Sequence, residues 1–204
     1  MSLLALLMAT TLLDFDEAAD TALWRPVDDV VMGGVSRSAF DVAEPGVARF
    51  SGNVSLENFG GFASVRTPPR DWDTTGATAF VLRVRGDGKQ YKFTLRTGDG
   101  FDGIQYQARF QPPAGEWAEV RLPVESFVAT FRGRKVPFAP RLDPARVRAL
   151  GLMISDKQAG EFELLVDRGG IERWGVRSSP WFAPATVPNR YRPRRRAGRR
   201  DRCG

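Results

Sequence analysis

The stretch F-V-L-R-V-R-G-D-G-K-Q-Y-K-F-T-L-R, residues 80–96, decides the fold class. Its two ends largely alternate between apolar and polar side chains, which is typical of half-buried strands. Gly86, Asp87 and Gly88 lie between these ends, and a hairpin turn is the simplest explanation for them. The stretch therefore predicts two antiparallel strands, Phe80–Arg85 and Tyr91–Arg96, joined by a tight turn.

Similar alternation recurs along the chain, with turn residues between the segments. Further strands are predicted at Gly46–Ser51, Phe62–Thr67, Ile104–Phe110, Glu116–Leu122, Ala149–Ile154 and Phe162–Arg168. One helical turn is expected at Asp143–Ala149, because Asp143 can cap it and Pro144 suits its first position. About ten short strands separated by turns predict an all-β fold, an antiparallel β-sandwich.

Length and composition fit a single domain, which we place at residues 13–176. The chain has 204 residues with 42% hydrophobic content, enough to bury a substantial core without dividing. Cys203 is the single cysteine, so an internal disulfide and a cysteine-ligated zinc cluster are excluded. This cysteine usage favours a reducing compartment, and we expect a cytoplasmic protein.

Residues 1–12 precede this domain as an apolar N-terminal extension. The segment lacks the basic region and the small-residue cleavage site of a signal peptide, and it is too short to span a bilayer. Met8 offers another reading, in which translation starts there and the first seven residues are a mis-assigned start. The sequence leaves open whether residues 1–12 are a signal segment.

The C-terminal segment, residues 177–204, differs in composition from the domain. It holds nine arginines against one acid, a charge of +8 in a chain of net charge +6, so the rest of the chain is slightly acidic. Prolines and the arginine run prevent it from burying enough apolar surface to fold alone, which predicts a disordered basic tail. Such a tail can contact anionic lipid or nucleic acid through its charge. A solvated extension without a dedicated partner is an equal alternative.

Four segments rich in glycine and charged residues interrupt the strands. They read W-R-P-V-D-D-V-V-M-G-G-V-S at residues 24–36, E-N-F-G-G-F at 57–62, R-V-R-G-D-G-K-Q-Y at 83–91 and S-D-K-Q-A-G-E-F at 155–162. Glycine permits backbone angles closed to other residues and aspartate readily accepts from nearby amides, so ordered loops are predicted. Ordered loops on a rigid scaffold often carry function, and we expect these four to converge at one place.

The order and wording of these segments resemble the complex I intermediate-associated protein 30 family. The family pattern joins a Trp and D-D-x-V-M-G-G-V-S to F-S-G-x-V-S-L-E-N-x-G-G-F-A-S-V-R and then to R-G-D-G-K-x-Y. Phe50–Arg66 follows the second of these closely, and the likeness spans the chain from Leu13 to Trp174. Agreement over several segments is far more specific than a match to one motif.

This resemblance implies a galactose-binding-like jelly roll and a chaperone-like role in assembling respiratory NADH:ubiquinone oxidoreductase, complex I. The implied partner is a protein, such as a respiratory-complex subunit or assembly intermediate. A position peripheral to the inner membrane would suit that role. We expect a monomer with no cofactor and no metal.

The predicted binding surface combines aromatic, charged and glycine residues from the four loops and the strands beside them, the usual anchors of binding sites. Core packing is the alternative for the aromatics, and internal ion pairs are the alternative for Arg85 with Asp87 and for Arg66 with Glu57. The residues are Trp24, Asp28, Asp29, Met32, Gly33, Gly34, Glu57, Asn58, Phe59, Phe62, Arg66, Arg85, Asp87, Tyr91, Asp156 and Lys157.

Catalysis is not expected, because the chain contains no histidine. Histidine-dependent nucleophile systems and histidine-ligated metals are thereby excluded. A hydrolase would need carboxyl groups among Asp28, Asp29, Glu57 and Asp87 to face each other in a cleft. The glycine-rich segment 97–103, with Asp99 and Asp102, is better explained as a turn than as a calcium site.

A carbohydrate-binding module is the alternative function, and it follows only from the jelly-roll analogy. A sugar site needs exposed aromatic platforms beside polar groups in a groove, whereas a protein-binding surface has a broader apolar patch with a polar rim. The exposed side chains therefore distinguish the two.

Overall fold

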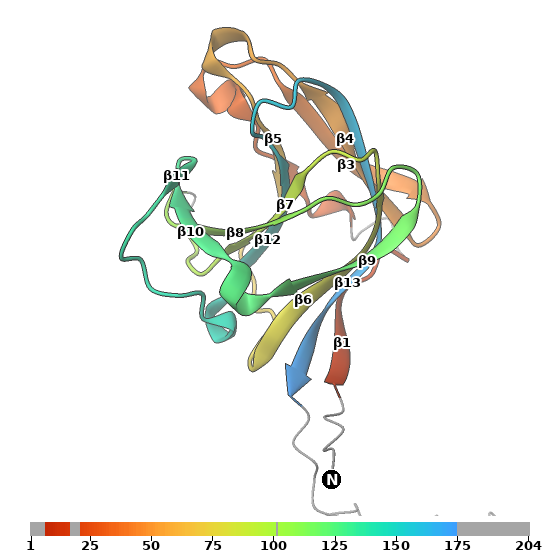
Figure 1. Ribbon diagram of the computed structural model, residues 1–204, viewed down its shortest axis with the longest axis vertical. Coiled ribbons are helices and arrows are strands. Elements are labelled where there is room, and N and C mark those ends of the chain that lie inside the picture. The colour runs from red at the N-terminus through yellow and green to blue at the C-terminus, as the bar shows by residue number, and fades with distance from the viewer. Residues whose placement is uncertain (1–6, 17–20, 101, 175–204) are drawn as a thin grey trace, which may run out of the picture.

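The computed structural model describes residues 7–16, 21–100 and 102–174, and they form an all-β molecule (Figure 1). Short 3-10 turns connect some strands: η1 (Asp29–Met32), η2 (Glu57–Phe59), η3 (Val124–Ser126) and η4 (Pro144–Arg146). None of the helices in this part of the chain is long and apolar enough to cross a membrane. The predicted basic tail, residues 177–204, lies outside the described residues.

One sheet has six strands in the order β3-β4-β13-β6-β9, with β1 also paired to β13. Every pair is antiparallel. The long β13 is the centre of this sheet, because it pairs with β4 and β1 on one edge and with β6 on the other. The strands are β1 (Leu7–Leu13), β3 (Arg37–Glu44), β4 (Val47–Val54), β6 (Ala77–Gly86), β9 (Trp117–Pro123) and β13 (Gly160–Trp174).

The other sheet has seven strands in the order β11-β10-β8-β7-β12-β5-β2 and is also antiparallel. Its middle strands β7 and β12 are buried along nearly their whole length, whereas β8 alternates between buried and more exposed residues. The strands are β2 (Arg25–Pro26), β5 (Ala63–Arg66), β7 (Tyr91–Arg96), β8 (Gln105–Phe110), β10 (Val128–Phe131), β11 (Arg134–Lys135) and β12 (Ala149–Ile154).

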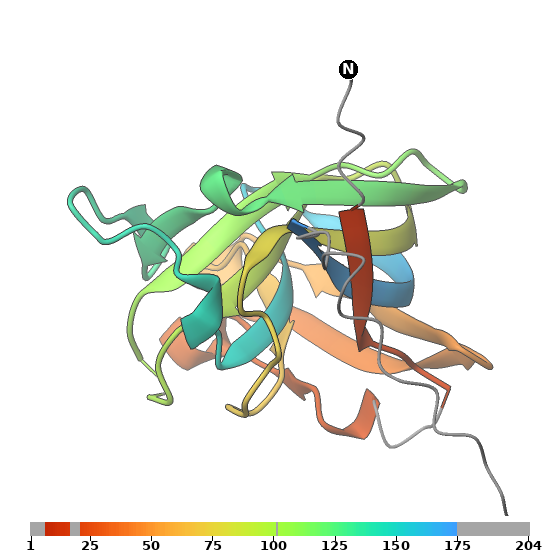
Figure 2. The same ribbon diagram turned by 90° about the horizontal axis from the view of Figure 1, so that it is seen from below.

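A single apolar core fills the space between the two sheets. Viewed from below, the strands of both sheets enclose that space (Figure 2). Phe50 and Phe80 come from the six-stranded sheet, while Tyr91 and Phe93 come from the other, and all four are almost fully buried. The Phe50 and Tyr91 rings lie 6.5 Å apart and the Phe80 and Phe93 rings 5.7 Å apart. The predicted antiparallel β-sandwich is therefore confirmed.

The hairpin predicted at Gly86–Gly88 is wrong. β6 pairs with β13 and β9, whereas β7 pairs with β12 and β8, so this segment crosses from one sheet to the other. Asp87 anchors the crossing, because its carboxylate accepts from the Tyr91 hydroxyl at 2.9 Å and from the Glu163 amide at 3.2 Å. Alternation reveals which face of a strand is buried, but it does not identify the strand beside it.

Other predicted elements agree with the structure to different degrees. The strands Tyr91–Arg96 and Ala149–Ile154 have the predicted bounds. The helical turn is shorter than predicted, although Asp143 does cap it by accepting from the Ala145 amide at 3.0 Å. β3 was not predicted, because as an edge strand it is mostly exposed on both faces and shows no clear alternation. β1 begins at Leu7, ahead of the expected domain start at Leu13, and pairs with β13.

Candidate functional site

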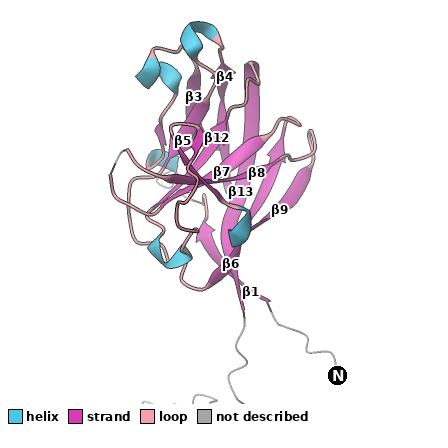
Figure 3. Cartoon of the chain, turned by 60° about the vertical axis from the view of Figure 1, so that its left-hand side comes forward, coloured by secondary structure: helices cyan, strands magenta, loops and turns pink. Residues whose placement is uncertain are grey.

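The four glycine-rich loops gather at one end of the sandwich. In the seven-stranded sheet, Ala63 and Tyr91 both pair with Ile154. The loops at 57–62, 83–91 and 155–162 therefore adjoin the same ends of three neighbouring strands. In the other sheet, Val54 pairs with Gly160, which joins the ends of the second and fourth loops. The 3-10 turns η1 and η2 lie close together at this end, beyond β3 and β4 (Figure 3).

The Asp29 carboxylate joins the first two loops. The side chain is fully buried. It accepts from Ser36 twice, from the amide at 2.9 Å and from the hydroxyl at 2.6 Å. From the second loop it accepts from the Gly61 amide at 2.7 Å and the Phe62 amide at 3.3 Å. A buried charge is tolerated only when it is well hydrogen-bonded, and here four donors satisfy one carboxylate.

Both diglycines are explained by their approach to this carboxylate. A Cβ atom on Gly34 would lie 2.4 Å from the Asp29 carboxyl carbon, and one on Gly60 would lie 2.6 Å from its Oδ2. Gly33 has a different role, because it ends η1 with φ of 91° and faces open space. One glycine in each pair therefore makes room for Asp29.

Asp28 ties the same region to two strands. Its carboxylate accepts from the Ser38 amide at 2.8 Å and the Ser38 hydroxyl at 2.7 Å, on β3. It also accepts from the Ser64 amide on β5 at 2.9 Å. Asp28 and Asp29 therefore join residues 27–38 to residues 55–64, and we call this hydrogen-bond network the aspartate lock.

Burial and hydrogen bonding have opposite effects on the pKa of Asp29. Burial alone would raise its pKa, but the Ser36 hydroxyl and the amides of Gly61, Ser36 and Phe62 stabilise the ionised form. Together they hold the pKa below its ordinary value of 3.8. The carboxylate is therefore an acceptor fixed in its charged state.

This shift predicts an acid-sensitive fold. Because the pKa of Asp29 is lower in the folded chain than in the unfolded chain, its contribution is present above pH 3.8 and is lost as the pH falls through the lowered value. The free energy of unfolding in urea, measured at about one-unit steps from about pH 3 to about pH 7, should fall as the pH drops below 3.8. Asp29→Asn should flatten that fall, and an equally steep fall in the variant would contradict the assignment.

Apolar side chains project from the two locked loops. They are Val30 and Met32 on η1, Val35 after it, and Leu56 and Phe59 around η2. The exposed fraction of these residues ranges from 44% to 102%. We call these five residues the apolar loop surface. Phe59 is fully exposed, and it follows Asn58 in a left-handed backbone conformation, with φ of 62° and 52°. Strained backbone of this kind persists only when the surroundings hold it, and it clusters at functional sites.

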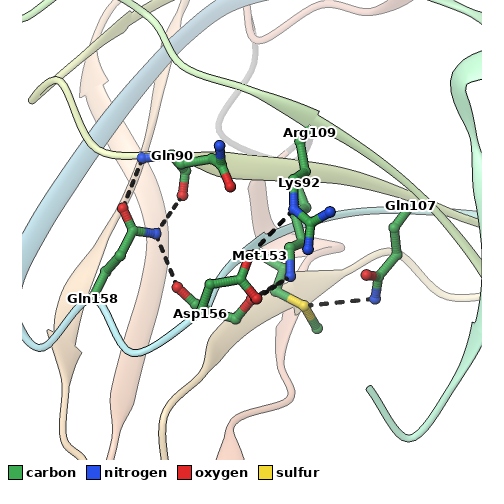
Figure 4. Close-up of polar contacts among 8 residues, drawn as sticks. Gln90, Lys92, Gln107, Arg109, Met153, Asp156 and Gln158 are labelled. Atoms are coloured by element: carbon green, nitrogen blue, oxygen red, sulfur yellow. Dashed lines mark hydrogen bonds and ion pairs between the residues drawn. The ribbon is translucent and has the colours of Figure 1, made fainter. Parts of the chain in front are cut away.

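The other two loops are joined by polar contacts of their own, shown in Figure 4. The Gln158 side chain accepts from the Gln90 amide at 2.9 Å and donates to the Gln90 carbonyl at 2.7 Å. Asp156 binds Lys92 at 2.8 Å and Arg109 at 3.3 Å. Burial alone would raise the pKa of Asp156, but the hydrogen bond and charge of Lys92, with Arg109, keep the pKa below 3.8.

Several predicted site residues turn out to be part of the scaffold. Trp24 is buried and stacks on Phe40 with ring centroids 4.5 Å apart, and Tyr91 is buried in the core. Arg85 does not pair with Asp87 among the ion pairs of the described residues; its guanidinium lies 5.3 Å from the centre of the Trp117 ring. Phe62 is half-buried, whereas Glu57 and Lys157 are exposed. Sequence reasoning missed Val30, Val35 and Leu56. The available signal was the presence of apolar residues within a few positions of each diglycine, in a segment predicted to be a loop.

Three of the four carboxylates considered for hydrolysis have hydrogen-bond partners within the protein. Asp28 and Asp29 accept from amides and hydroxyls, and Asp87 holds the crossing between the sheets. Asp99 and Asp102 bind Arg148 and Arg132, so both carboxylates of the proposed turn are engaged. In the part of the chain that the structure describes, no group of three or more cysteine or acidic side chains could hold a metal ion.

Known proteins resemble this chain in both sequence and fold. A family model described as complex I intermediate-associated protein 30 (CIA30) matches residues 13–166. A protein of that name, designated mitochondrial, from Neurospora crassa is 26% identical over 66% of this chain, and one from Drosophila melanogaster is 25% identical over 78%. The chain spans 55% and 62% of the lengths of these two relatives.

Among solved structures, a family 11 carbohydrate-binding module from Clostridium thermocellum, in complex with a β-1,3-1,4-mixed-linked tetrasaccharide, superposes with a TM-score of 0.61. The superposition covers 82% of this chain and 98% of the module, with 14% sequence identity. At that identity the likeness concerns the fold alone. The galactose-binding-like jelly roll predicted from the family resemblance is confirmed.

The predicted cytoplasmic location is wrong. The relatives from Neurospora and Drosophila are designated mitochondrial, and they point to a mitochondrial rather than a cytoplasmic location. The prediction relied on a single cysteine and on an N-terminal segment without basic residues. Cysteine usage reports the redox chemistry of a compartment and does not identify which compartment it is.

Proposed function

Because the chain belongs to the complex I intermediate-associated protein 30 family, we propose that it is a non-catalytic, chaperone-like module that holds an assembly intermediate of complex I. The intermediate binds through the apolar loop surface. The name of the relatives supplies the class of partner, and the exposed side chains supply the means of binding.

The observation that carries this proposal is that Phe59 is exposed together with Val30, Met32, Val35 and Leu56. A fully exposed phenylalanine costs free energy in water, and its left-handed backbone adds to that cost. The aspartate lock holds the loop in this conformation before any partner arrives. Pre-organised aromatic anchors surrounded by apolar neighbours are typical of protein-binding hot spots, because little entropy is lost on binding.

The engaged carboxylates support a non-catalytic role. A general acid or base must exchange a proton with the substrate, which requires access and a suitable pKa. Asp29 is fully buried and its pKa is lowered, so it holds no proton near neutral pH. The module therefore acts by binding.

The carbohydrate-binding alternative receives less support. In β5, β7, β8 and β12 the residues that alternate with the core positions face away from the core, and none of them is aromatic. A sugar platform on this face would need such a ring beside its polar groups. The exposed aromatic Phe59 belongs instead to a surface with Val30, Met32, Val35 and Leu56.

Replacing Phe59 should impair assembly of complex I. In cells that lack the gene and carry a Phe59→Asp copy, we expect little assembled complex on a native gel, because a hot-spot substitution weakens binding about tenfold or more. NADH:ubiquinone activity should fall in parallel. The free energy of unfolding should change by less than about 0.5 kcal/mol, since the side chain is exposed.

Phe138→Asp is the matched control. Phe138 is also fully exposed and left-handed, with φ of 64°, but it lies on the loop between β11 and η4. This variant should restore assembly as the unaltered gene does. Normal assembly with Phe59→Asp, or an equal defect with both variants, would refute the proposed function.

A further inference from the structure

The outer face of the seven-stranded sheet carries polar side chains that are nevertheless buried. On β7 the core positions are Tyr91, Phe93 and Leu95, so Lys92, Thr94 and Arg96 face outward. These three are only 5% to 7% exposed. Outward-facing polar side chains are normally solvated, so their burial needs an explanation. Figure 4 shows Lys92, Gln107, Arg109 and Met153 together on this face.

Arg96 is the most unusual member of the face. It is 7% exposed, and its Nε atom is buried without a hydrogen-bond partner among the described residues. Gly103 lies close to the other end of the guanidinium, because a Cβ there would be 3.2 Å from Nη2. No described acid lies within salt-bridge distance of Arg96. A buried donor left unsatisfied costs free energy that a bound acceptor would recover.

Arg66 adds a second positive charge nearby. Burial, and then the charge of Arg96, lower the pKa of Arg66 to about 10. Burial also lowers the pKa of Arg96, although the negative charge of Asp102 partly offsets this decrease. Two guanidinium groups that repel each other in a partly desolvated place would both be stabilised by an anion between or beside them.

Asp102 and Asp156 both form ion pairs with other residues. Asp102 binds Arg132 at 2.6 Å, and Asp156 binds both Lys92 and Arg109. Gly151 separates Arg66 from Thr94 in the sheet, since it pairs with both. A side chain at Gly151 would come within 2.5 Å of the Thr94 hydroxyl and 2.8 Å of the Val65 carbonyl, so Thr94 and the backbone of β5 approach Gly151 closely.

We propose that this face binds a small ligand through a carboxylate or phosphate group, held by the guanidinium groups of Arg96 and Arg66 beside Gly151. Guanidinium presents a planar set of donors that matches both oxyanions. The burial of Arg96 and Thr94 favours a small group over a broad macromolecular surface, because only a small group reaches side chains so little exposed. This oxyanion site is separate from the apolar loop surface and does not rest on the proposed function.

Titration with inorganic phosphate and with citrate tests the site. Calorimetry and thermal unfolding of the full chain would be measured at constant ionic strength, with sodium chloride as the reference salt. We expect saturable binding of at least one of the two anions and a rise in Tm beyond that in chloride. Phosphate alone or citrate alone would identify which oxyanion the site prefers.

Arg96→Gln should weaken that binding about tenfold or more, because a charge-assisted hydrogen bond is lost. Arg66→Gln should weaken the binding by a similar factor, and this variant tests the site if Arg96→Gln does not fold. Arg121→Gln is the control, since Arg121 pairs with Glu172 on the opposite sheet and should leave the anion effect unchanged. Phe59→Asp should also leave it unchanged.

Three results would overturn the oxyanion site. The first is the absence of any saturable effect of phosphate or citrate beyond that of chloride. The second is an equal effect in Arg96→Gln, Arg66→Gln and Arg121→Gln, which would show general salt stabilisation. The third is a high-resolution structure in phosphate and citrate with only a water molecule at the Arg96 Nε.

Discussion

Asp29→Asn should lower the free energy of unfolding by about 3 kcal/mol, since it removes charge-assisted hydrogen bonds from a fully buried site. All four groups around the carboxylate donate hydrogen bonds. An asparagine amide would turn its own donor toward at least one of them, so an acceptor is lost and a donor is left unsatisfied. Urea unfolding monitored by tryptophan fluorescence would measure the loss.

Asp41→Asn is the matched control for this substitution. Asp41 also binds its partner Arg49 through two contacts of 3.0 Å, but both side chains are substantially exposed. Exposed ion pairs contribute at most about 1 kcal/mol, so this variant should be nearly as stable as the unaltered chain. Similar losses for the two variants would mean that Asp29 has no special part in the fold.

Gly34→Ala and Gly60→Ala should each destabilise the fold by about 2 kcal/mol or more, because the new methyl group would overlap the Asp29 carboxylate. The overlap is severe, at 2.4 Å for Gly34 and 2.6 Å for Gly60. Asp29 cannot move aside without breaking its hydrogen bonds, and Gly60 is also close to the Glu57 carbonyl. Thermal and urea unfolding would measure both variants.

Two other glycines separate overlap from backbone strain. A methyl group on Gly98 would meet nothing within 4 Å, so Gly98→Ala should be neutral. Gly33→Ala should cost about 1 kcal/mol, from its left-handed backbone alone. The expected order of stability is Gly98→Ala, then Gly33→Ala, then Gly34→Ala and Gly60→Ala. Equal stability of Gly33→Ala and Gly34→Ala would contradict the proposed packing around Asp29.

The strands could be predicted from sequence where alternation is strong. Tyr91–Arg96 and Ala149–Ile154 are central strands with one face in the core, and their bounds were correct. Edge strands such as β3 and β11 lack that contrast and were missed. The error at Gly86–Gly88 has another cause, because the partner of a strand depends on contacts far away in sequence.

The candidate site could be predicted only in part. The four loops were correctly expected to converge. The sequence could not show that Asp28 and Asp29 face inward while Met32 and Phe59 face outward, because neighbouring loop residues follow no periodic rule. Nor could it show that Arg96 is buried, since its position in the alternation predicts a solvated side chain.

Asp29, Gly34 and Gly60 therefore link the sequence motif to the proposed function. Their packing fixes the two loops, and the fixed loops expose Met32 and Phe59. Variants that break the aspartate lock should lose partner binding together with stability, whereas Phe59→Asp should lose binding alone. This difference separates the scaffold from the surface it presents.

Site-specific crosslinking tests the central claim most directly. A photoreactive phenylalanine analogue placed at residue 59, in living cells, should form adducts with subunits of an incomplete complex I, identified by mass spectrometry. The same analogue at residue 138, which is equally exposed, should form few or none. Adducts with complex I subunits from residue 138 and none from residue 59 would contradict a docking surface on the locked loops.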